Sequence, residues 1–288
     1  MFSSPEDIQE QFARQKFIIG LKPATVVFLA LRLHRPLLVE GPAGVGKTEL
    51  ARVLAETTGS RFIRLQCYEG LDECKALYEW NYHKQLLRIY ADHQENKTWE
   101  HIRQSIYTPE FLLDRPLLQA LSQKDPVVLL IDELDKSDEE FESFLLEILS
   151  EYQISIPELG TVRAEHIPAV VLTSNNFRNF GDALKRRCIH LYIDYPDFEQ
   201  ELQIVRLKVP DINERFAYRI VSFIQNLRKD RLRKAPSIAE TINWAEALLE
   251  LGIDEITEKV IDQTAGVFLK YREDIEKISS RDLSELLD

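Results

Sequence analysis

Short apolar runs, bounded by turn-forming residues, recur along the first 195 residues of the chain. They lie at Leu37–Glu40, Phe62–Leu65, Val127–Ile131, Ala169–Thr173 and Ile189–Ile193. Short runs that are apolar throughout are typical of strands buried on both faces. Helical patterns separate most of these runs. The alternation predicts an α/β fold, with a parallel five-stranded sheet flanked by helices.

The clearest helical pattern follows the third run. Its apolar residues recur at the spacing of one helix face, at Phe141, Phe144, Leu145, Ile148, Leu149 and Tyr152. Ser137 and Glu140 have the spacing of a capping box, which predicts that the helix begins there. Before the fourth run, the segment QISIPELGTVRA alternates around Leu159-Gly160 and predicts a β-hairpin.

The pattern changes after Tyr195-Pro196, where strand-like runs stop and helical patterns continue. Asp197 with Gln200, and Ser237 with Glu240, are expected helix starts, and Gly252 is an expected helix stop. We therefore expect an α/β domain over residues 1–195 and a helical lid domain over residues 196–288.

A glycine-rich segment follows the first apolar run and opens a helical pattern. It reads GPAGVGKT and matches the P-loop pattern GxxxxGK[ST] in the context that this motif requires. Glycines let successive backbone N–H groups turn towards phosphate oxygens, and the helix N-terminus adds a partial positive charge. Lys47 is the candidate to bridge the β- and γ-phosphates, and Thr48 is a candidate ligand of Mg²⁺. The expected nucleotide-binding residues are Gly41, Pro42, Ala43, Gly44, Val45, Gly46, Lys47, Thr48 and Glu49.

Two acidic residues end the third run, VVLLIDE, which is expected to be a central strand. Ligands of open α/β sheets bind at the carboxyl edge of the strands. Asp132 is therefore a candidate for the Mg²⁺ shell, and Glu133 a candidate to orient and deprotonate the attacking water. The chain lacks the DxxG and NKxD patterns of a GTPase. Further acidic residues are expected to be a solvated helix start, namely Asp135, Asp138, Glu139 and Glu142.

Composition limits the remaining possibilities. The chain has 288 residues and a net charge of −12, so it has no general attraction for nucleic acid. Cys67, Cys74 and Cys188 form no CxxC pair, which favours reduced thiols over a metal or disulfide role. The N-terminus lacks the pattern of a signal peptide, and the longest apolar run, Ala24–Leu31, is shorter than the roughly 20 residues of a transmembrane helix. We expect a cytoplasmic protein without a membrane span.

The long segments between these motifs resemble AAA+ ATPases of the MoxR family over nearly the whole chain. They include QCYEGLDECKALYEWNY, VVLLIDELDKSDEEFESFLLEILSEYQISIPELGTVRA and LKRRCIHLYIDYP. The chain is most similar to the CoxD-like branch, which is associated with molybdenum hydroxylases such as carbon monoxide dehydrogenase. The resemblance implies an AAA+ fold, hydrolysis of ATP with Mg²⁺, and a homo-oligomer that is a hexameric ring. It also implies a remodelling or chaperone role in maturing a metalloenzyme, together with a partner that carries a VWA domain.

The resemblance implies roles for further residues by position. The sensor-1 asparagine matches Asn175 in LTSNN, with Asn176 as the alternative, and the arginine finger matches Arg187 in LKRRC, with Arg186 as the alternative. Related ATPases carry a sensor-2 arginine where this chain reads PSIA, at residues 236–239. A basic cluster precedes that segment and is either a solvated helix end or a substitute, with members Arg228, Lys229, Arg231, Arg233 and Lys234.

The distance from the P-loop to Asp132 is long for this class, and the resemblance implies a helix-2 insertion within residues 68–123. Its aromatic residues either pack in the core or face a substrate, namely Trp80, Tyr82, Trp99 and Tyr107. Two other functions stay open. One is a nucleic-acid motor or loader, and the other is a switch that binds ATP with little turnover.

Overall fold

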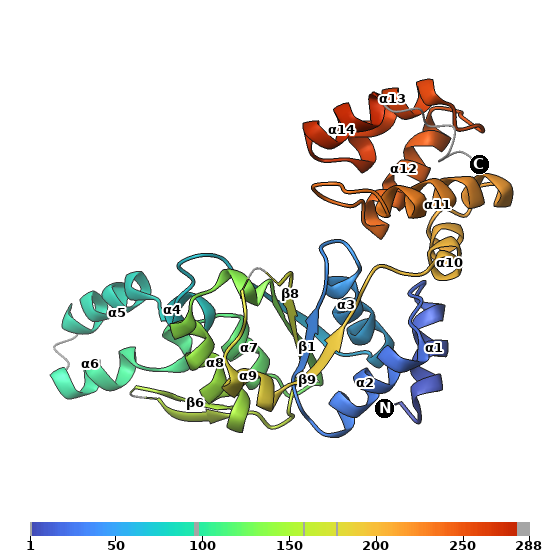
Figure 1. Ribbon diagram of the computed structural model, residues 1–288. Coiled ribbons are helices and arrows are strands. Elements are labelled where there is room, and N and C mark those ends of the chain that lie inside the picture. The colour runs from blue at the N-terminus through green and yellow to red at the C-terminus, as the bar shows by residue number, and fades with distance from the viewer. Residues whose placement is uncertain (1, 95–97, 158, 177, 281–288) are drawn as a thin grey trace. The chain divides into compact units, whose positions relative to one another are not determined.

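The computed structural model describes residues 2–94, 98–157, 159–176 and 178–280 (Figure 1). By its internal contacts the chain divides into two compact units. The first, which we call the sheet unit, contains residues 25–40 and 51–191. The second, which we call the lid unit, contains the described residues 2–24, 41–50 and 192–280. Within the described part of the chain, no helix is long and apolar enough to cross a bilayer.

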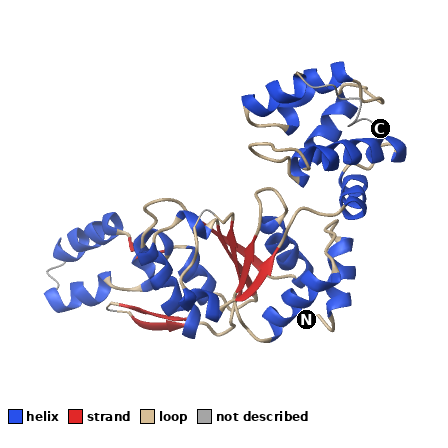
Figure 2. Ribbon diagram, in the orientation of Figure 1, coloured by secondary structure: helices blue, strands red, loops and turns tan. Residues whose placement is uncertain are grey.

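A five-stranded sheet with the order β2-β5-β8-β1-β9 forms the centre of the sheet unit (Figure 2). Its strands are β1 (Leu37–Glu40), β2 (Arg61–Gln66), β5 (Val127–Asp132), β8 (Ala169–Ser174) and β9 (Ile189–Tyr192). β2 pairs in parallel with β5, β5 with β8, and β8 with β1. All six residues of β5 are buried, as the uninterrupted apolar run predicts. The expected parallel sheet is confirmed, with strand ends that differ by at most one residue.

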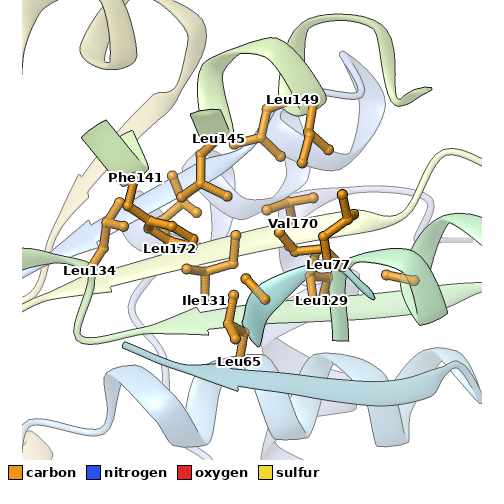
Figure 3. Packing of buried hydrophobic residues seen from close by; sticks show 14 of the residues in the cluster. Leu65, Leu77, Leu129, Ile131, Leu134, Phe141, Leu145, Leu149, Val170 and Leu172 are labelled. Carbon is orange, nitrogen blue, oxygen red and sulfur yellow. The ribbon is translucent and has the colours of Figure 1, made fainter. Parts of the chain in front are cut away.

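Five helices of the sheet unit lie before β1 or in the connections between its strands. They are α2 (Leu21–Arg32), α3 (Lys47–Thr58), α7 (Pro116–Ser122), α8 (Glu139–Glu151) and α9 (Asp182–Arg187). Figure 3 shows how leucines of α8, including Leu145 and Leu149, pack with Leu172 and Val170 of β8 in the main core. The expected hairpin is confirmed by β6 (Gln153–Ile156) and β7 (Gly160–Arg163), which pair antiparallel.

The start of α8 differs from the expected capping box. Asp138, and not Ser137, is the N-cap, and its side chain accepts a hydrogen bond from the N–H of Phe141 at 2.8 Å. Ser137 is buried instead, and its hydroxyl donates to the carbonyl of Leu134 at 2.8 Å. Both residues are good caps, and the turn that follows β5 selects between them.

A set of short elements is inserted in the sequence between β2 and β5. It contains α4 (Glu73–Ala76), β3 (Tyr78–Trp80), α5 (Tyr82–Gln94), α6 (Trp99–Ile106), the 3₁₀ helix Pro109–Phe111 and β4 (Leu112–Asp114). The expected aromatic residues divide between two roles. The rings of Trp80 and Tyr107 pack edge to face at 5.2 Å, whereas Tyr82 is 62% exposed and Trp99 is 67% exposed.

The lid unit contains the remaining helices. They are α1 (Pro5–Arg14), α10 (Phe198–Lys208), α11 (Glu214–Arg228), α12 (Ile238–Glu250), α13 (Glu258–Phe268) and α14 (Arg272–Ser279). Asp197 caps α10, Ser237 and Glu240 form a capping box on α12, and Gly252 adopts φ +67° just after α12. These helix ends confirm the helix starts and the helix stop predicted from the sequence. The core of the unit centres on Trp244, which is fully buried.

The basic cluster before α12 is not uniformly solvated. Arg228 is buried, and its guanidinium holds both carboxylate oxygens of Glu201, with Nη2 to Oε1 at 2.7 Å. Its Nε also donates to the carbonyl of Pro236 at 2.7 Å. The alternative of a solvated helix end is therefore excluded for Arg228. Arg233 differs, because its side chain is 56% exposed and its ion pair with Glu273 is 3.3 Å long.

Arg228→Ala is expected to lower the free energy of unfolding by about 3–5 kcal/mol, because it leaves the fully buried carboxylate of Glu201 unpaired. Arg233→Ala is the matched control, and its exposed pair should contribute no more than about 1 kcal/mol. Urea denaturation of the two variants measures both values. Similar small losses for both would contradict the structural role of Arg228.

Candidate functional site

Asp132 ends β5, and its carboxylate is buried, with a residue exposure of 3%. The hydroxyl of Thr173 on β8 donates to Asp132 Oδ1 at 2.5 Å and accepts from the backbone N–H of Glu133 at 2.9 Å. Glu133 adopts a left-handed backbone conformation, with φ 55° and ψ 47°. This conformation costs a non-glycine residue about 1–3 kcal/mol and is concentrated at functional sites. Thr173 therefore holds both acidic residues in a strained turn.

The carboxylate of Glu133 gathers donors from three elements. Oε2 accepts from Gln66 Nε2 of β2 at 2.7 Å and from Lys136 Nζ at 2.6 Å. Oε1 accepts from Asn175 Nδ2, just after β8, at 3.4 Å. The contact with Glu133 also raises the pKa of Lys136. The structure thus places the side chains of Glu133 and Asn175, two of the candidate site residues, beside each other.

A guanidinium approaches the other carboxylate. Arg64 of β2 donates from Nε and Nη2 to Asp132 Oδ2 at 3.1 and 2.6 Å. Four residues in this arrangement have no role predicted from the sequence, namely Arg64, Gln66, Thr173 and Lys136. A signal for two of them exists, because Arg64 and Gln66 are polar residues two positions apart and so lie on one face of β2, opposite the buried Ile63 and Leu65.

The acidic residues after Glu133 are only partly solvated, which corrects the expectation for Asp135 and Glu142. Asp135 is buried, and its Oδ2 accepts from the backbone N–H of Asn175 at 3.0 Å. Glu142 is buried, pairs with Arg178 at 3.0 Å and accepts from the N–H of Gly181 at 2.8 Å. Both carboxylates anchor the loop after β8. Glu139 is exposed, as expected.

Arg187 is the last residue of α9 and is exposed. Its Nε donates to the hydroxyl of Ser150, at the end of α8, at 2.8 Å, and its Nη1 donates to the carbonyl of Ala183 at 3.3 Å. Arg186 is also exposed. The hydrogen bond to Ser150 therefore gives Arg187 a defined position on the surface of the sheet unit.

The glycines of the P-loop, in the lid unit, are required by backbone conformation and space. Gly41 has φ +151°, and a Cβ there would lie 1.9 Å from the carbonyl oxygen of Ile193. Gly44 has φ +77°, and a Cβ there would lie 2.2 Å from Ser237 Oγ. Lys47 is buried, and its Nζ donates to the carbonyls of Gly41 and Pro42 at 2.8 and 2.6 Å. The lysine side chain thus folds back over the loop that it follows.

The segment in which related ATPases carry an arginine contacts the P-loop. The N–H of Ala239 donates to the carbonyl of Gly44 at 3.4 Å, beside the close approach of Ser237. Ile238 is buried. Besides Arg228, two further members of the basic cluster have ion-pair partners within the lid unit. Arg233 pairs with Glu273, and Lys234 pairs with Glu240 at 3.7 Å. Lys208 of α10 pairs with Glu49 of the P-loop helix at 3.4 Å.

Two candidate ligands of Mg²⁺ have suitable chemistry. Thr48, in the lid unit, has a hydroxyl and Asp132, in the sheet unit, has a carboxylate, and both are hard oxygen ligands of the kind that Mg²⁺ prefers. Among the described residues, no group of three or more His, Cys, Asp or Glu side chains gathers to hold a metal ion. A Mg²⁺ ion bound to either side chain would therefore need phosphate oxygens or waters as further ligands, which is how nucleotide sites commonly hold it.

Comparisons with known proteins show what the chain is similar to. The profile described as "ATPase family associated with various cellular activities (AAA)" matches residues 37–195. The gas vesicle ATPase GvpN of Haloferax mediterranei is 24% identical over 242 residues, which cover 80% of this chain and 66% of that protein. An uncharacterised protein of Staphylococcus aureus (strain bovine RF122 / ET3-1) is 25% identical over 226 residues, 76% of this chain and 77% of that protein. A mutant of Thermotoga maritima RuvB aligns with TM-score 0.51 and 17% identity, over 92% of this chain and 72% of that one.

Thiol labelling tests the burial and the negative surroundings of Cys67, which lies beside the end of β5. Burial, followed by the negative charges of Asp132, Asp135 and Glu133, raises the pKa of Cys67 to about 12. Burial also raises the pKa of Cys188 to about 12, whereas Cys74 is exposed. At pH 8 roughly 1 in 10⁴ of such buried thiols is thiolate, the reactive form.

We therefore expect iodoacetamide at pH 8 to modify Cys74 in the native protein. Cys67 and Cys188 should react only after denaturation, as measured by mass spectrometry of peptides. Labelling of Cys67 in the native protein as fast as Cys74 would show that Cys67 is not buried beside the acidic end of β5 as described.

Proposed function

We propose a function from the premise that this chain belongs to the AAA family of ATPases, whose profile covers residues 37–195. The chain binds ATP with Mg²⁺ and hydrolyses it to ADP and phosphate. One observation carries this proposal above the others. The carboxylate of Glu133 lies beside the amide of Asn175 and directly after the buried carboxylate of Asp132, at the carboxyl end of a central strand.

Each residue then has a separate task. Glu133 orients the attacking water and accepts its proton, and the Asn175 amide, 3.4 Å from Glu133 Oε1, helps to hold that water or a γ-phosphate oxygen. Lys47 exchanges the loop carbonyls for phosphate oxygens, a contact that a mobile ammonium makes as a point charge. Mg²⁺, held by Thr48 and Asp132 together with the phosphates, would neutralise the charge of the nucleotide.

We propose the MoxR type within this family because the long segments between the motifs carry that resemblance. The type implies a hexameric ring that remodels or activates a metalloenzyme, such as a molybdenum hydroxylase, with a VWA-domain partner. The relationship to GvpN, itself named an ATPase, supports the enzymatic part of this proposal at 24% identity. The net charge of −12 disfavours the alternative of a nucleic-acid motor.

Two substitutions separate nucleotide binding from hydrolysis. Lys47→Ala removes the lysine of the phosphate loop and should abolish ATP binding in calorimetry. Glu133→Gln keeps the shape and loses the base, so turnover should fall by about 10²–10⁴-fold while ATP still binds. Unchanged turnover in Glu133→Gln would reject the role of Glu133. A parent protein that binds ATP without turnover would instead favour the switch function.

Arg187 gives the proposed ring a test. An arginine finger stabilises the transition state of a neighbouring subunit, so Arg187→Ala should bind ATP normally and lose up to about 10³-fold in turnover. A mixture of Arg187→Ala and Lys47→Ala should recover part of the activity, because an intact P-loop then meets an intact finger. Arg186→Ala is the control and should matter less. A dilute monomer with full activity, or an inactive mixture of variants that do co-assemble, would exclude a finger acting between subunits.

A further inference from the structure

We propose that Arg64 is a positioning residue that competes with the divalent cation for Asp132 and thereby sets the Mg²⁺ concentration at which the chain binds nucleotide. This inference rests on the proposed function, because it takes Asp132 as part of the metal site. It concerns a different property, namely the availability of Asp132. No sequence motif used above assigns a role to Arg64.

Arg64 and Thr173 both contact the carboxylate of Asp132. Arg64 donates two hydrogen bonds to Oδ2, while Thr173 donates to Oδ1. An ionised carboxylate oxygen has about two lone pairs for acceptance. The guanidinium therefore takes the acceptor positions of Oδ2 that a metal ion or a metal-bound water would use. Its positive charge also weakens the attraction of this carboxylate for any second cation.

The side chains of Asp132 and Arg64 differ in their exposure to solvent. The side chain of Asp132 is 4% exposed, whereas that of Arg64 is 48% exposed. A buried carboxylate is stabilised by a nearby positive charge, so a metal ion that displaces Arg64 would supply the charge that the guanidinium withdraws. The half-exposed guanidinium can leave towards water at low cost, which makes Arg64 suited to a reversible exchange with Mg²⁺.

A third contact shows how this exchange reaches the neighbouring acid. Arg64 also donates to Gln66 Oε1, and Gln66 Nε2 donates to Glu133 at 2.7 Å. These two bonds fix the amide orientation of Gln66, because its oxygen faces the guanidinium and its nitrogen faces the carboxylate. If Arg64 moves away from Asp132, Gln66 also loses the hydrogen bond that Arg64 donates to its Oε1. One arginine on β2 thus links the cation position to the orientation of Glu133.

The experiment measures nucleotide binding and needs no turnover. A fluorescent β,γ-imido analogue of ATP is titrated into the parent and Arg64→Gln at buffered Mg²⁺ concentrations and in EDTA. A neighbouring positive charge weakens the binding of a second cation to a carboxylate, and solvent screening of the half-exposed Arg64 limits this effect to about tenfold. The Mg²⁺ concentration for half-maximal binding should therefore fall about tenfold in Arg64→Gln. Affinity in EDTA should stay within about twofold, because Arg64 acts through the cation.

Two variants serve as controls. Arg64→Lys keeps the charge without the planar fork, so its Mg²⁺ requirement should stay closer to the parent than that of Arg64→Gln. Arg61→Gln removes the same charge from the same strand, at a side chain that contacts Gln123, and should leave the requirement unchanged. Thermal melting of each variant establishes that it is folded.

The outcomes separate this inference from the proposed function. An unchanged or raised Mg²⁺ requirement in folded Arg64→Gln would overturn the competition. Weaker binding in EDTA would show that Arg64 contacts phosphate and would overturn it as well. A parent protein that binds no nucleotide under any of these conditions would instead reject the proposed function.

Discussion

A carboxylate buried at the end of β5 is the constraint on which the sheet unit depends. A charge withdrawn from water has to be paired and hydrogen-bonded, or its burial outweighs the gain from packing. Asp132 obtains those partners from both neighbouring strands, Arg64 on β2 and Thr173 on β8. This requires β5 to lie between β2 and β8, in the register that places Gln66 beside Asp132. A slip of one residue would turn Arg64 to the opposite face and leave the carboxylate without its cation.

The same constraint determines the turn after β5. Thr173 accepts the N–H of Glu133 with the hydroxyl that donates to Asp132, so one side chain supports a buried acid and a left-handed residue. Valine has a similar shape but can neither donate nor accept, and it would leave both groups without this partner. Because the turn is held in this way, Glu133 points to Gln66 and Lys136, and its position does not depend on an exposed loop.

The sequence predicts those parts of the molecule that local patterns determine. The strands follow from apolar runs, the hairpin from alternation around Leu159-Gly160, and the helix starts at Asp197 and Ser237 from capping residues. It fails where burial depends on contacts distant in the chain. In the sequence Glu142 resembles a solvated helix residue, but in the structure it is paired with Arg178. In the same way Arg228 resembles a solvated helix end, but it is paired with the buried Glu201. Arg64 is missed for the same reason, because its partner lies 68 positions away.

The segment that lacks an arginine illustrates a different way to join the lid helices to the P-loop. A side chain at Gly44 would collide with Ser237, and the N–H of Ala239 reaches the carbonyl of Gly44. Ser237 cannot withdraw freely, because it forms the capping box of α12 with Glu240. Within the lid unit, the conformation of the P-loop and the position of the start of α12 therefore constrain each other through close packing. An arginine would supply attraction to phosphate over a longer range, which salt screens, whereas steric contact is insensitive to salt. For this reason we expect the response of the lid helices to nucleotide to depend on the shape of the P-loop more than on charge.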